Sequence, residues 1–400
     1  MARPRAIALV RLCALLAVAG LGAGCATPGL EAARQNYYLG RTAEADRVLE
    51  TAKPPEKDQV LFLMERGAIR QGAGRYEDSA KDFDAAARRL EELQTYSLSK
   101  GAASWVVNDG VQNFRGAPFE RTMVHVMAAK NYLALGAWDD AAVEARRIIK
   151  SLEPDLRGKY PEDAYSRYMA GFCLEMIDDA SNAGLQYRRA SELMGGLAVD
   201  DRTGRIYTRP PPGPDGQPAP PPAEAAEPWP AELVVFIMIG RAPRADTQWY
   251  ENWQPEPAAY AEIYAGEKCL GRSYNLADTV ELAFRTEKIQ ALQKTAKTVG
   301  RIILKEGVAQ AIEHNTQNDA LADLVRIILI GWLEQPDVRR WETLPRWMQV
   351  ARVRAPDDLS GIKVVFKNFS GNTLRTTEIS HPWSRRRSTF ITFCRDIVPR

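Results

Sequence analysis

The side chains that most often perform catalysis or bind metals are sparse and scattered in this 400-residue chain. It has three histidines, His125, His314 and His381, and they do not share the spacing of a metal site. No zinc-protease helix motif, paired-cysteine motif, phosphate-binding glycine loop or nucleophile elbow is present. Carboxylates alone can hydrolyse glycosidic bonds, so an action on peptidoglycan is not excluded, but no pattern supports it. We therefore expect a protein that is not an enzyme and that uses neither a cofactor nor a metal.

Cys25 is the residue with the clearest chemistry. Residues 1–21 are a basic segment without acids followed by an apolar run, which is the layout of a secretory signal. The run is interrupted by glycine too early to span a membrane, which needs about 20 consecutive apolar residues. The small residues at 22–24 resemble the lipobox of bacterial lipoproteins, although Gly22 departs from the leucine or branched residue usual there. An ordinary secretory signal and an uncleaved anchor are the alternatives.

The lipobox resemblance implies a signal peptide over residues 1–24 and acylation of the Cys25 thiol. Because Ala26 and not an aspartate follows, it also implies the periplasmic face of the outer membrane. The whole chain has 53 basic and 51 acidic residues. Such a nearly neutral chain has no global field that would attract nucleic acid, so we expect the acyl chains to provide membrane attachment. Cys269 and Cys394 either pair in the oxidising periplasm or, as we favour, remain buried free thiols.

A repeated spacing follows four turn residues in the first half of the chain. Each is followed five positions later by a small residue, and apolar or aromatic residues, alanine included, come at nine and twelve positions. The turn residues and their small partners are Gly40 with Ala45, Gly74 with Ser79, Gly136 with Ala141, and Asp178 with Ala183. A further small residue lies seven positions before three of the turns, as Gly67, Ala129 and Gly171. A turn residue of positive φ and a small residue where two helices cross together predict helix hairpins.

These segments resemble tetratricopeptide repeats, most clearly in MAAKNYLALGAWDDAAVEARRIIKSLEP and LMERGAIRQGAGRYEDSAKDFDAAARRLEEL. The resemblance implies a solenoid of stacked hairpins over residues 25–200, with a concave groove for a partner. The positions that face the groove in the family correspond to mostly apolar residues here. The candidate partner-binding residues are Met64, Met123, Val126, Lys130, Tyr165, Tyr168 and Phe172. An apolar or amphipathic segment of a partner is the expected ligand.

Two alternatives to an open groove follow from the same residues. The aromatic side chains Tyr165, Tyr168 and Phe172 would also suit packing against the neighbouring hairpin or against the second half of the chain. Separately, the C-terminal helices could fill the groove, and nothing would then dock there. An insertion is expected at about 96–122, with Arg115 and Glu120 solvated at its rim.

The segment 201–231 is rich in proline and predicts an extended loop without a helix. The remainder, 232–400, begins with ELVVFIMIG, which predicts a strand buried on both faces. A helical pattern runs from Leu276 to Ile312, and a compact apolar helix is expected at 320–333. The chain end alternates as antiparallel strands do, which predicts one small sheet. The expected fold class is mainly α, α+β: a helical-hairpin solenoid followed by a mixed α/β domain.

The segment DVRRWETLPRWMQVARV carries a second resemblance, to an uncharacterised bacterial lipoprotein family with a D-x-R-x-W-x-x-L-P motif. The motif residues are Asp337, Arg339, Trp341, Leu344 and Pro345. In an extended segment, alternate side chains point the same way, which predicts an ion pair of Asp337 and Arg339 covered by the Trp341 indole. Pro345 is expected to fix the turn into a strand. The resemblance implies a role in envelope biogenesis.

Together these patterns predict a lipid-anchored periplasmic scaffold or adaptor that binds other cell-envelope proteins. The alternative is a protein that binds or acts on peptidoglycan through its C-terminal half. Neither the partner nor the oligomeric state follows from the residues, because helical repeats serve binding in many unrelated systems.

Overall fold

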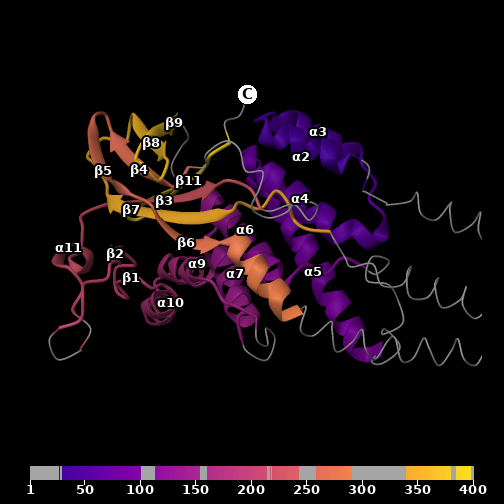
Figure 1. Ribbon diagram of the computed structural model, residues 1–400, viewed down its shortest axis with the longest axis horizontal. Helices are drawn as coiled ribbons and strands as arrows, with labels where there is room; N and C mark the ends of the chain where they lie inside the picture. Colours follow the sequence, from indigo (N-terminus) through magenta and orange to yellow (C-terminus); the bar gives the residue numbers. More distant parts are fainter. Residues whose placement is uncertain are drawn as a thin grey trace, which may run out of the picture.

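The chain builds three layers, which are a set of paired helices, a five-stranded sheet and a four-stranded sheet (Figure 1). The computed structural model describes residues 27, 29–100, 113–153, 160–213, 217, 219–242, 258–290, 339–379 and 384–397. Within them, helices dominate up to Leu193 and strands dominate from Leu197 onward. The predicted α+β class is confirmed.

The helices of the first half form consecutive pairs joined by short turns. The pairs are α2 (Leu30–Tyr38) with α3 (Thr42–Thr51), α4 (Gln59–Gly72) with α5 (Tyr76–Lys100), α6 (Pro118–Leu135) with α7 (Trp138–Ser151), and α9 (Ala164–Glu175) with α10 (Ala180–Leu193). A single 3-10 turn, η1 (Glu56–Asp58), precedes α4. The turn residues Gly40, Gly74, Gly136 and Asp178 have φ of 78°, 77°, 70° and 66°. These values confirm the predicted hairpin turns, because only glycine, and less readily aspartate or asparagine, adopts this left-handed backbone at low cost.

The helices of a pair approach each other where small residues lie. A Cβ atom at Gly67 would lie 2.9 Å from the Phe83 ring, and one at Gly171 would lie 2.9 Å from the Tyr187 ring. Both aromatic side chains are buried. The predicted close contact of the two helices is therefore confirmed at these pairs, since any larger side chain would push the second helix away.

The five-stranded sheet has the strand order β10-β11-β3-β7-β6. Its strands are β3 (Glu232–Ile239), β6 (Tyr274–Asp278), β7 (Trp347–Arg354), β10 (Ser384–Arg386) and β11 (Thr389–Arg395). The pair of β11 and β3 is parallel, whereas β3 pairs with β7 and β7 with β6 in antiparallel fashion. The sheet therefore joins segments that lie more than 100 positions apart in sequence.

The second sheet has the order β5-β4-β8-β9 and packs on the five-stranded sheet. Its strands are β4 (Tyr260–Ala265), β5 (Lys268–Arg272), β8 (Ile362–Lys367) and β9 (Thr373–Glu378). Val234, Phe236 and Met238 of β3 face the helices, and the alternate residues, such as Val235 and Ile237, face the second sheet. The prediction that β3 is buried on both faces is confirmed, because successive side chains of a strand point to opposite sides.

Several predictions for the second half are wrong. Leu276 lies on strand β6, so the predicted helix begins later, at residue 279, and it continues to residue 290, where this described stretch ends. The predicted helix at 320–333 lies outside the described residues. The single small sheet expected at the chain end is also wrong, because β8 and β9 join β4 and β5, whereas β10 and β11 join β3. Alternation specifies that a segment is a strand, but its apolar neighbours decide which strand it pairs with.

The predicted insertion at about 96–122 is shorter than expected, since α5 continues to Lys100 and α6 begins at Pro118. In the proline-rich segment, β2 (Ile206–Thr208) pairs with β1 (Leu197–Val199). One helical turn, α11 (Ala223–Ala226), follows Pro222 although no helix was expected there. Proline is compatible with a helix start, where its missing N–H has no helical partner to lose.

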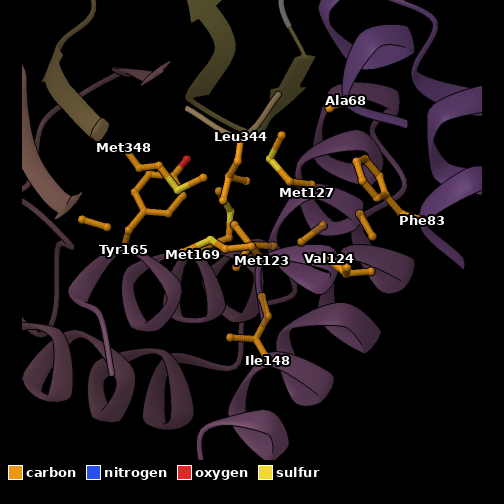
Figure 2. Close-up of a cluster of buried hydrophobic side chains, with 14 of the residues drawn as sticks. Ala68, Phe83, Met123, Val124, Met127, Ile148, Tyr165, Met169, Leu344 and Met348 are labelled. Carbon is orange, nitrogen blue, oxygen red and sulfur yellow. The ribbon is translucent and has the colours of Figure 1, made fainter. Parts of the chain in front are cut away.

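One hydrophobic core joins the predicted domains 25–200 and 232–400. Figure 2 shows Leu344 and Met348 of the second half beside Met123, Met127 and Tyr165 of the helices, and all five are buried. The two halves therefore share their largest apolar cluster. Among the described helices, none has the length and apolar character needed to cross a membrane.

Candidate functional site

The predicted partner-binding groove is filled by the sheet of the same chain. Its residues lie on one side of α4, α6 and α9, termed the inner face from here on. Each of them is at most 1% exposed: Met64, Met123, Val126, Lys130, Tyr165, Tyr168 and Phe172. The prediction of an open groove at these residues is wrong. They share one buried cluster with the apolar face of β3, so neither surface is exposed.

Phe236 of β3 is the centre of this contact. Its ring centroid lies 6.3 Å from that of Tyr165, 6.4 Å from that of Tyr168 and 5.2 Å from that of Phe172. All three ring pairs are close to edge-on, which is the arrangement that aromatic quadrupoles favour. The alternative that these three aromatic residues pack against the second half is confirmed.

A short segment before β7, residues 339–346, lies across the helices and is termed the strap. Its backbone is held by two buried carboxylates of the helical half. Glu65 accepts hydrogen bonds from the backbone N–H groups of Glu342 at 2.8 Å and Thr343 at 3.2 Å. Glu120 accepts from the N–H of Trp341 at 3.0 Å and from that of Ala117 at 2.6 Å. The strap thus gains the backbone partners that a strand would otherwise supply.

Charge at the strap is well balanced. Arg34 of α2 lies 2.5 Å from Glu65 and 3.0 Å from Glu342, and it donates to the carbonyl of Arg340 at 3.0 Å. Burial alone would lower the pKa of Arg34, but the two glutamates outweigh it and raise that pKa. Burial raises the pKa of Glu120 although two backbone N–H groups oppose the shift. The expectation that Glu120 is solvated is therefore wrong.

The D-x-R-x-W-x-x-L-P motif supplies most of the strap. Arg339 forms an ion pair of 2.7 Å with Asp58, the last residue of η1. Asp337, the predicted partner of Arg339, lies outside the described residues. Trp341 is 1% exposed, and its ring centroid lies 5.7 Å from that of Phe83 on α5. Leu344 is buried in the shared core, and the Pro345 carbonyl accepts from Thr279 at 2.7 Å shortly before β7 begins. In the structure the motif joins the helices to the sheet.

Lys130 is buried in the inner face without a carboxylate beside it in the described part of the chain. Its ammonium group donates to the Gln71 side-chain oxygen at 2.7 Å and lies 3.0 Å from the Met238 sulfur. Burial, with the positive charge of Arg395, holds the pKa of Lys130 well below its usual value. A lysine in this setting favours the neutral amine and behaves as a polar core residue.

An open cleft of about 810 Å³ lies between α5, α6 and α7 and is termed the α5–α7 cleft. On α6 it is lined by Arg121, His125 and Tyr132, whose spacing places them opposite Met123 and Lys130 on the helix circumference. The cleft and the inner face therefore lie on opposite sides of α6.

One end of this cleft is basic. The start of α6 lies beside the end of α7, where the Ser151 hydroxyl and the Thr122 hydroxyl are 3.0 Å apart. Arg115, Arg121 and Lys150 line this end, and among the described residues they form no ion pair. The Arg115 Nε is buried without a hydrogen-bond partner in the described structure. Burial and the nearby charge of Arg115 lower the pKa of Arg121, although Tyr160 and Glu120 oppose the shift.

The other end carries acidic side chains, two of which already form hydrogen bonds or ion pairs within the chain. Asp84 accepts a hydrogen bond of 2.9 Å from the Tyr132 hydroxyl, and Glu144 lies 2.8 Å from His125 Nδ1 and also contacts Arg147. A histidine beside a carboxylate can serve as the base that activates a nucleophile. The Ser151 hydroxyl in the same cleft is not placed for that role, because it bonds to the Thr122 hydroxyl and the Ile148 carbonyl. No group of three metal-ligating side chains occurs in the described part of the chain. The arrangement suits electrostatic binding better than catalysis.

Sequence reasoning missed this cleft, although a signal was present. α6 is apolar around most of its circumference, and Arg121 and His125 form a polar stripe four residues apart on it. Asp140, Glu144 and Arg147 form a similar stripe on α7. Polar stripes that face each other on neighbouring helices indicate a solvent-accessible surface between the two helices.

Comparison with models of protein families, with curated proteins and with solved structures finds no match for this chain.

Proposed function

We propose that this protein is a lipid-anchored adaptor that holds another cell-envelope protein at the periplasmic face of the outer membrane. Anchoring rests on the sequence around Cys25, which lies outside the described residues. The helix pairs, with their turn residues at the four repeated positions, support assignment to the tetratricopeptide-like repeat architecture.

The docking surface in this proposal is the α5–α7 cleft and not the inner face. The observation that carries it is the pair of arginines, Arg115 and Arg121, that line an open cleft without forming an ion pair in the described structure. Charges that remain uncompensated in the free protein are ready to pair with a partner. The inner face has no such capacity, because its charges and apolar groups are already used by the strap and β3.

Site-specific photo-crosslinking in the intact cells that make this protein tests the adaptor role. A photoreactive residue at Val143, a cleft residue 42% exposed, is expected to yield a discrete protein adduct. The matched control is the same residue at Leu185 on α10, which is also 42% exposed but lies outside the cleft. Equal adducts at both positions, or none at Val143, would contradict the proposal.

Anchoring is tested separately by the Cys25→Ser variant. If acylation of Cys25 holds the protein on the membrane, the variant moves to the soluble periplasmic fraction and loses its acyl mass. A variant that stays membrane-bound and acylated would contradict the lipoprotein assignment. The proposed role of the α5–α7 cleft would not be affected by that result.

A further inference from the structure

We infer that the basic end of the α5–α7 cleft binds carboxylate groups of an acidic peptide segment that belongs to the partner; this rests on the proposed adaptor function and names the chemistry of its ligand. Arg115 and Arg121 are the residues that would contact those carboxylates.

The first argument is the unmet hydrogen-bonding capacity of these arginines. A guanidinium presents five N–H donors in a planar fork that matches the two oxygens of a carboxylate. Arg121 forms no ion pair in the described structure, and Arg115 Nε is buried without a hydrogen-bond partner. A carboxylate bound in the cleft would pair with the Arg121 guanidinium and offset the cost of its desolvation.

The second argument is the distribution of charge and apolar surface along the cleft. Lys150 adds to the basic end, whereas Asp140 and Glu144 lie nearer the start of α7 at the other end. Val143, which is 42% exposed, and the partly exposed Ala87 supply apolar surface within the cleft. A peptide with acidic side chains at one end of an apolar stretch complements this pattern, and recognition of acidic motifs by arginine clusters is a recurrent mode of peptide binding.

The experiment measures fluorescence anisotropy of a labelled ten-residue peptide of alternating glutamate and alanine with the full-length protein. The matched peptide has glutamine in place of every glutamate. The protein variants are Arg115→Gln and Arg121→Gln, and the control variant is Arg146→Gln, which removes an exposed arginine of α7 outside the cleft. We expect binding of the glutamate peptide alone, weakened roughly tenfold or more by each cleft variant and unchanged by the control.

Thermal unfolding separates binding from folding. Because Arg121 is desolvated and unpaired, Arg121→Gln is expected to leave the Tm unchanged or raise it while peptide binding falls. A residue that served only to hold the fold would lower the Tm instead. If Arg121→Gln does not fold, Arg115→Gln supplies the same comparison.

Three outcomes would overturn the inference. In the first, the glutamine peptide binds as tightly as the glutamate peptide. In the second, both cleft variants bind the glutamate peptide as tightly as the parent protein does. The third is co-sedimentation with purified peptidoglycan that needs Arg121 without any peptide binding, which would make a peptidoglycan fragment the ligand. If the glutamate peptide fails but crosslinking at Val143 still captures a partner, the ligand chemistry is wrong and the adaptor function stands.

Discussion

The inner face and the α5–α7 cleft lie on opposite sides of α6, and they handle buried charge in different ways. Arg34 at the strap and Arg121 in the cleft are both arginines for which burial alone lowers the pKa. Glu65 and Glu342 reverse that effect for Arg34, whereas for Arg121 burial prevails and its pKa falls. The same residue type therefore holds the fold together on one side and remains available for a ligand on the other.

The difference shows where this protein uses its binding energy. On the inner face, carboxylates, strap N–H groups and aromatic rings are all satisfied within the chain, so their interaction contributes to folding. In the cleft, Arg115 and Arg121 form no ion pair among the described residues, and in our proposal they pair with carboxylates of a partner. A charge left unpaired lowers stability, and its retention in a fold indicates another role.

The largest expected effect comes from Glu65→Ala on the inner face. Removing this carboxylate leaves two strap N–H groups without an acceptor and leaves Arg34 without its closest carboxylate, which is expected to lower the free energy of unfolding by about 3–5 kcal/mol. Urea denaturation measures the change. The matched control is Glu92→Ala, because Glu92 forms an exposed ion pair of 2.9 Å with Arg89. A surface pair of this kind contributes at most about 1 kcal/mol, and a similar loss in both variants would contradict the role of the strap.

A smaller, pH-dependent effect is expected at Lys130. Its folded-state pKa lies below the usual 10.5 of the unfolded chain, so between these two values the unfolded chain binds the additional proton. Stability therefore rises with pH across that window, by up to about 1.4 kcal/mol per pH unit, and falls as the pH decreases.

The variant Lys130→Met removes this titrating group from the core. The free energy of unfolding, measured as a function of pH below the unfolded-state pKa of 10.5, is expected to rise less steeply in the variant than in the parent protein. The buried tyrosines titrate in both proteins and cancel in the difference. The control is Lys81→Met, since the Lys81 side chain is 73% exposed. Parallel pH curves for parent and Lys130→Met would show that Lys130 is charged in the folded core.

Thiol labelling gives the smallest perturbation and tests whether the inner face opens. Cys173 on α9 is fully buried, and burial raises the pKa of the Cys394 thiol to about 12, whereas Cys269 is exposed. A cysteine introduced by Val143→Cys in the cleft is expected to react with iodoacetamide on the order of 10³-fold faster than Cys173, which reacts only after unfolding. Peptide mass spectrometry measures each site. Comparable rates at Cys173 and at the cleft cysteine would mean that the inner face opens to solvent.

The sequence allowed the local structure of the first half to be predicted well. Gly40, Gly74, Gly136 and Asp178 set turns through a backbone preference that belongs to each residue. Gly67 and Gly171 permit close packing because they have no side chain. The apolar run of β3 was also enough to predict burial on both faces. The candidate site was predicted poorly, because apolar residues such as Tyr165 and Phe172 suit a partner's segment and the chain's own sheet equally well.

The residues by themselves determined where helices begin, turn and approach each other, since these depend on backbone conformations and side-chain sizes within about 40 positions. Only the tertiary structure decided that β11 lies parallel to β3, that Glu65 and Glu120 hold the strap, and that Phe236 occupies the inner face. Those contacts join residues more than 60 positions apart, and a local pattern carries no information on which of several complementary surfaces will meet. The same physical reason leaves Arg121 without an ion pair among the described residues, because pairing depends on what the fold brings within a few ångströms.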